Sequence, residues 1–166
     1  AGHVVINKAI STSAGLTVAG ANTFTLNASS AVGSMAGSGK VSLPSGVNLT
    51  FGSNGASTTW SGPILGQGSL VKVGSGTTAL GSSGQSTFSG GTKISAGNLV
   101  CYTPGALGTG SVTLDGGSLT LATALQAVSG FGDTGTGWTF NGGATAAGDV
   151  LTVTTANGSL ARTAFY

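Results

Sequence analysis

Charged side chains are the scarcest feature of this 166-residue chain. They make up 5% of it, against about 25% in ordinary globular domains. The net charge of +2 is too small for a nucleic-acid-binding patch. So few charges also leave strand edges without the lysines that usually block edge-to-edge pairing. We therefore expect a protein that sits in an assembly, on a surface or inside a longer array. The five cations are scattered: Lys8, Lys40, Lys72, Lys93 and Arg162.

Residues that commonly build catalytic or metal sites are also rare. The single Cys101 excludes an internal disulfide, and we interpret it as a buried, inert thiol, with a reactive thiol as the alternative. His3 is the only histidine, so a two-histidine metal site is excluded. The acids Asp115, Asp133 and Asp149 lie beside glycine or in turns, which favours turn residues over a calcium or catalytic cluster. We expect no catalytic residue, metal or cofactor, and no enzymatic activity.

Long apolar runs and proline are scarce as well. No window reaches the ~18 to 20 apolar residues of a membrane-spanning helix. No basic and apolar leader precedes the first strand, which fits either a processed form or a fragment. With 3 prolines against 32 glycines the chain is not collagen-like. A hydrophobic content of 39% and a mean hydropathy of +0.36 favour a folded protein over a disordered one.

Short alternating segments separated by glycine corners recur along the chain, most clearly from Gly66 to Val100. There the alternation places Leu70 and Lys72 on one side of a strand. This rhythm is typical of radial or solenoidal β repetition. With three strands per coil we expect about five coils, stacked ~4.8 Å apart. Gly33 to Gly39 is expected to be a glycine-rich corner. The predicted strands are 3–10, 15–19, 23–27, 40–43, 47–51, 57–60, 70–73, 93–96, 99–102, 111–114 and 118–121.

Several glycine-rich motifs in this rhythm form an ordered set: Val32–Gly39, Ser57–Gly62, Gly66–Gly76, Phe88–Thr92 and Ala96–Leu99. As a set they resemble the autotransporter-associated β-strand repeat over roughly residues 32–121. The resemblance implies a right-handed parallel β-helix in a bacterial passenger that is secreted or displayed on the cell surface. The fold class expected is therefore all-β, a parallel β-solenoid with a short C-terminal β-strand segment.

The pattern of sequence motifs changes near Phe131. The motifs Gly130–Asn141, Gly148–Thr154 and Ala161–Tyr166 are similar to the opening strands of L-type-lectin-like domains. We therefore divide the chain into a solenoid, 1–128, and a tail, 129–166, that packs on the solenoid or on a neighbouring subunit. Because of this resemblance, Trp138 and Tyr166 are the better candidates for stacking on a sugar. Core or corner packing is the favoured interpretation of all the large aromatic side chains, Trp60 and Tyr102 included.

The function favoured by these observations is structural: a non-catalytic extracellular β-solenoid that acts as a surface stalk, an adhesin segment or a self-assembling fibre subunit. Its expected partners are copies of itself or a longer parent chain, and surface glycans, with no nucleic acid and no membrane span. A carbohydrate-binding surface module is the first alternative. A polysaccharide lyase or hydrolase that depends on Asp115 or Asp149 is the second.

Overall fold

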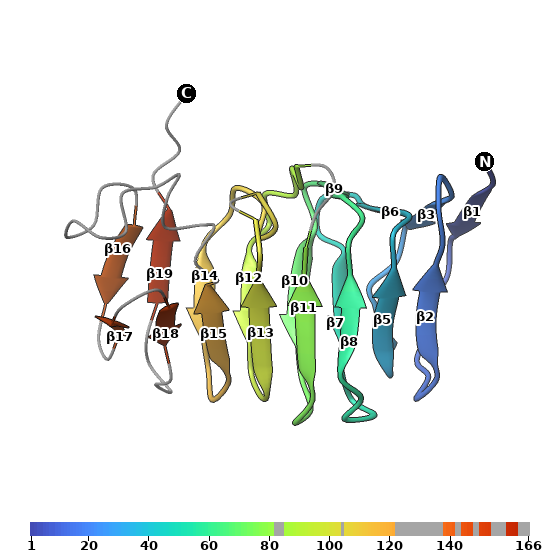
Figure 1. Cartoon of the computed structure of the whole chain (residues 1–166). Helices are drawn as coiled ribbons and strands as arrows, with labels where there is room; N and C mark the ends of the chain where they lie inside the picture. Colours follow the sequence, from blue (N-terminus) through green and yellow to red (C-terminus); the bar gives the residue numbers. More distant parts are fainter. Residues whose placement is uncertain are drawn as a thin grey trace.

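The computed structural model describes residues 1–81, 85–103 and 105–121, and beyond them four strands within 138–162. The described part contains strands and turns but no helix. Its parallel sheets stack as a β-solenoid of about six turns (Figure 1). The prediction of an all-β parallel solenoid is thus confirmed. The predicted boundary between residues 128 and 129 lies outside the described residues.

The solenoid has three faces, each a parallel sheet that takes one strand from successive turns. The A face consists of β1 (His3–Ile6), β3 (Thr23–Leu26), β6 (Lys40–Leu43) and β9 (Ile64–Gly66). The B face contains β4 (Ser30–Val32), β7 (Asn48–Phe51), β10 (Ser69–Lys72), β12 (Thr92–Ile94) and β14 (Val112–Leu114). The C face contains β2 (Gly15–Val18), β5 (Ser34–Gly37), β8 (Thr58–Trp60), β11 (Thr77–Leu80), β13 (Asn98–Cys101) and β15 (Ser118–Leu121).

The prediction of about five coils was wrong, because not every turn has a strand on every face. In the first turn, the B face is represented only by an isolated bridge between Ser11 and Ala31. In the last two turns, the A face continues as backbone hydrogen bonds without forming strands. Thr87 N donates to Ile64 O at 2.9 Å, and Thr109 N donates to Phe88 O at 3.0 Å. The same strands therefore extend over about six turns.

The prediction of a glycine-rich corner at Gly33 to Gly39 was also wrong, because the strand β5 occupies most of this segment. Met35 in this strand is fully buried and lies in register with Leu16 of the preceding turn. The change of direction falls at Gly33 instead. A Cβ atom there would lie 1.8 Å from the carbonyl oxygen of Ser13, so only glycine allows the two turns to stack.

The core consists of columns of inward-facing side chains, one from each turn. On the B face, Val32, Phe51, Ile94 and Leu114 form such a column together with Lys72. On the C face, the column contains Trp60, Leu80, Cys101 and Leu121. Each turn thereby completes the burial of its neighbours, which is how a solenoid acquires its stability.

The predicted buried, inert character of Cys101 agrees with its surroundings. Its side chain is 1% exposed, and this burial raises the pKa of the thiol. Because the thiolate is the reactive form, a raised pKa makes the native thiol a poor nucleophile. Trp60, two layers away in the same column, is equally buried, and its Nε1 donates to Gly62 O at 2.7 Å.

The last described strands run antiparallel to the solenoid. β19 (Ser159–Arg162) pairs with β14, and β18 (Val150–Val153) pairs with β15. β16 (Trp138–Asn141) and β17 (Ala144–Ala147) then pair with β19 and β18. The B and C sheets thus continue beyond the last turn, at the left of Figure 1.

Candidate functional site

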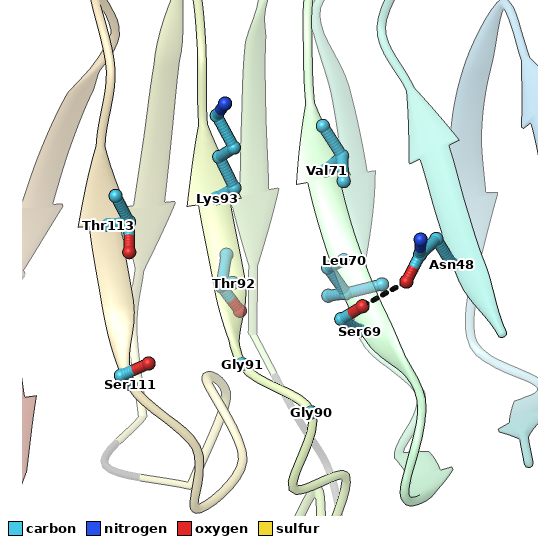
Figure 2. Close-up of a pocket in the computed structure, with 10 residues that line it drawn as sticks. All are labelled: Asn48, Ser69, Leu70, Val71, Gly90, Gly91, Thr92, Lys93, Ser111 and Thr113. Atoms are coloured by element: carbon cyan, nitrogen blue, oxygen red, sulfur yellow. Dashed lines mark hydrogen bonds between the residues drawn. The ribbon is translucent and has the colours of Figure 1, made fainter. Parts of the chain in front are cut away.

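A shallow groove with polar lining lies on the outer surface of the B face among the described residues (Figure 2). It has a volume of about 210 Å³ and crosses β7, β10, β12 and β14. Neighbouring strands lie ~4.8 Å apart, so the groove extends about 14 Å along the solenoid axis. Its lining combines side chains with bare backbone: Asn48, Ser69, Leu70, Val71, Gly90, Gly91, Thr92, Lys93, Ser111 and Thr113.

A missing side chain creates the hollow. The positions of Asn48, Ser69, Gly91 and Ser111 follow one another from turn to turn along the outer surface. Gly91 has a φ of +93°, and a Cβ atom there would lie 2.7 Å from the carbonyl oxygen of Ser111. Figure 2 shows the backbone of Gly90 and Gly91 bare between Ser69 and Ser111. The close stacking of turns therefore requires glycine here, and the groove is its consequence.

The polar groups around this hollow differ in their partners. Ser69 Oγ donates to Asn48 Oδ1 (Figure 2). The hydroxyls of Ser111 and Thr113 have no hydrogen-bond partner within the described part of the chain. A hydroxyl both donates and accepts. Within the described structure, these two groups can therefore bind a ligand without breaking an existing hydrogen bond.

The charges beside the groove cancel. Lys93 Nζ lies 2.7 Å from Asp115 Oδ2, and the two side chains are 50% and 53% exposed. Asp115 itself lies in the bend that follows β14. An ion pair this exposed contributes little stability, about 0–1 kcal/mol. Its main effect is local, because it gives the groove one donor and one acceptor whose charges cancel each other.

A buried lysine was not singled out by the sequence analysis. Lys72 has no exposed surface and faces inward in the B-face column. Its Nζ donates to the carbonyl oxygens of Val73 at 2.7 Å, Gly74 at 3.0 Å and Ala96 at 3.4 Å. Burial lowers the pKa of this lysine. The sequence did indicate that Lys72 is buried, because the alternation places it on the same side of the strand as the apolar Leu70.

The structure describes the side chains of two of the aromatic candidates, Trp60 and Tyr102. Trp60 is buried in the core, as the packing interpretation predicted, whereas Tyr102 is 51% exposed just after β13. Trp138 is the first residue of β16, opposite Arg162, and its side chain lies outside the described residues. Tyr166 lies outside them as well. Sugar stacking by Trp138 and Tyr166 therefore stays a prediction.

The remaining candidates form no cluster in the part of the chain that the structure describes. His3 Nε2 lies 2.8 Å from Thr25 Oγ1 on the exposed A face. Asp133 and Asp149 fall outside the described residues. Among those that are described, no group of three or more His, Cys, Asp or Glu could hold a metal ion. Within the same ranges no helix is long and apolar enough to cross a membrane.

The first turn of the solenoid is open. β1 and β2 are the end strands of the A and C sheets, with no further strand beside them among the described residues. Val4 occupies an inward position, in register with Phe24, yet it is 52% exposed. A hollow of about 310 Å³ lies here, lined in part by Val4, Val18 and Phe24. The end of the core thus reaches solvent at this turn.

Comparison of the chain with protein-family models, with curated proteins and with solved structures finds no match. The resemblances to the autotransporter-associated repeat and to L-type-lectin-like strands stay predictions.

Proposed function

We propose that this protein is a non-catalytic, structural β-solenoid of the bacterial cell surface or extracellular space, and that it assembles end to end through its open first turn. It then serves as a fibre subunit or as a segment of a surface stalk or adhesin. The observation that carries the proposal is the half-exposed Val4 at an inward-facing position. In a solenoid, a further turn at such an end gains the same contacts as every turn inside it.

The composition of the open turn supports this. β1 has the sequence HVVI and β2 has GLTV, so neither contains a lysine or a proline. Exposed strand edges without these residues are templates for strand addition. Val5, the outward neighbour of Val4, is also 44% exposed, which gives the edge apolar character on both sides of the strand.

The far ends of the B and C sheets offer a second pair of open edges among the described residues. β16 and β17 are the end strands of the B and C sheets. Addition of one copy's first turn to these strands of the next copy is a head-to-tail contact. A contact of this kind does not close on itself unless the rotation forms a ring, so it generates an open filament.

A matched pair of substitutions on β1 tests the proposal. Val4→Lys places a charge at the inward, core-end position, whereas Val5→Lys places the same charge on the outward side. Light scattering after size exclusion and negative-stain microscopy should show filaments for the wild type and for Val5→Lys, and single particles for Val4→Lys. A wild-type protein that stays monomeric at high concentration would rule out the fibre. Filaments formed equally by Val4→Lys would show that the first turn is not the contact.

A further inference from the structure

We propose that the B-face groove binds a neutral polysaccharide chain, which lies along the solenoid axis across β7, β10, β12 and β14. The site lies on the outer surface of the B face, away from the open first turn. It does not depend on end-to-end assembly. The argument comes from the shape of the groove, its hydrogen-bonding groups and its charge.

The shape indicates a ligand that is longer than it is deep. A volume of about 210 Å³ corresponds to roughly seven liquid-like waters at ~30 Å³ each. Pockets for drug-sized molecules start at about 300 Å³. The groove is therefore too small to enclose such a molecule, but it has room for one sugar ring above Gly91. The ring's neighbours in a chain would lie over the adjacent turns.

The hydrogen-bonding groups favour a polyhydroxylated ligand. The hydroxyls of Ser111 and Thr113 are free within the described structure, and each can donate and accept. They lie on the outer side of the turn next to Gly91, so a ring in the hollow is within their reach. An extended peptide is disfavoured, because peptides join a sheet at its edge through backbone groups, and this groove lies on a sheet face.

The electrostatics favour a neutral ligand. Among the described side chains, the charges at the groove are Lys93 and its partner Asp115, joined at 2.7 Å. An acidic polysaccharide would have to compete with Asp115 for the ammonium group, and it would meet the repulsion of that carboxylate. A neutral chain instead finds an acceptor and a donor already placed, and it leaves the ion pair intact.

The test is an NMR titration of the full chain with the neutral probes cellohexaose, maltohexaose, mannohexaose and chitohexaose, and with hexagalacturonate as the acidic comparison. We expect at least one neutral probe to shift the amides around Gly91, and Ser111→Ala/Thr113→Val to weaken its binding. The loss should be about 2- to 10-fold for each hydrogen bond removed. Thr59→Val, an exposed threonine on the C face, is the control and should bind like the wild type.

Three results would overturn the proposal. The first is that no neutral probe shifts these amides at the solubility limit of the sugars. The second is equal binding by the wild type and by Ser111→Ala/Thr113→Val. The third is tighter binding of hexagalacturonate than of every neutral probe. Light scattering on the same samples reports assembly independently, so a failure of sugar binding is distinguishable from a failure of fibre formation.

Discussion

Replacing the buried Lys72 with methionine tests whether its hydrogen bonds to backbone carbonyl groups at the corners stabilise the solenoid. Methionine is similarly long and unbranched, but it cannot donate a hydrogen bond. In the native protein, the ammonium group donates to the carbonyl oxygens of Val73, Gly74 and Ala96, and none of these three acceptors is a carboxylate. The substitution therefore removes one charge and leaves the corner carbonyls without their donor.

Two opposing energies decide the outcome. Hydrogen bonds from a charged donor contribute about 1.5–3 kcal/mol each, so the two shorter ones, at 2.7 and 3.0 Å, contribute about 3–6 kcal/mol together. This stabilisation is opposed by the cost of burying an ammonium ion, which is several kcal/mol. Val73, Gly74 and Ala96 are partly exposed, so water near this corner reduces both terms. We expect Lys72→Met to lower the free energy of unfolding by about 1–3 kcal/mol at neutral pH.

Urea denaturation followed by circular dichroism measures this loss, with Lys93→Met as the control. Lys93 is half exposed and paired with Asp115, so its replacement should cost about 0–1 kcal/mol. The slope of the free energy against urea should be the same in all three proteins, because the surface exposed on unfolding does not change. If Lys72→Met is as stable as Lys93→Met, the corner hydrogen bonds do not offset the burial of the charge, and the reasoning is refuted.

The pH dependence supplies a second readout of the same substitution. Burial lowers the pKa of Lys72 in the folded state below its ordinary value of 10.5. Between the lowered pKa and 10.5 the unfolded chain binds more protons, so Lys72 makes the wild type more stable as the pH rises. The raised pKa of Cys101 has the opposite effect, because it makes the folded protein less stable as the pH rises above the ordinary thiol pKa of 9.0. Comparing the wild type with Lys72→Met cancels the Cys101 contribution. The free energy of unfolding of the wild type minus that of Lys72→Met should therefore increase as the pH rises towards 10.5.

Two further predictions concern the core. Phe51→Ala removes a fully buried ring between Val32 and Lys72, and it should destabilise the protein by about 3–5 kcal/mol in urea denaturation; a loss below about 1 kcal/mol would contradict the column packing. Cys101 should react with Ellman's reagent only after unfolding, because its thiol is 1% exposed and burial raises its pKa. Reaction of the native protein at the rate of a free thiol would be inconsistent with that burial.

The alternating strands of the solenoid were predictable from local sequence, because their apolar and polar residues follow the two-residue period. Lys40–Leu43 and Ser118–Leu121 were both expected as strands, and each buries its second and fourth residues. The turn at Gly52–Gly55 falls between the predicted strands 47–51 and 57–60, and its glycine and asparagine residues suit turns.

What local sequence did not show is which segments pair with the neighbouring turn. β5 has the sequence SMAG, which resembles a turn, but it forms a strand because it is hydrogen-bonded to β2 on one side and β8 on the other. The groove was hidden for a similar reason. Gly91 has outer-surface neighbours at Ser69 and Ser111, each about twenty residues away in the chain, and only the register of the turns makes the gap between them visible.

The direction of the hydrogen bonds between turns determines how this protein would respond to tension. Hydrogen bonds between parallel strands run along the solenoid axis, so a force that pulls the two ends apart acts on the contacts between turns in series. Twenty residues separate the register partners His3 and Thr23, and a released turn of that length extends to about 70 Å, against ~4.8 Å when stacked. A stalk built this way would lengthen turn by turn, absorbing work at each step while the remaining turns stay folded.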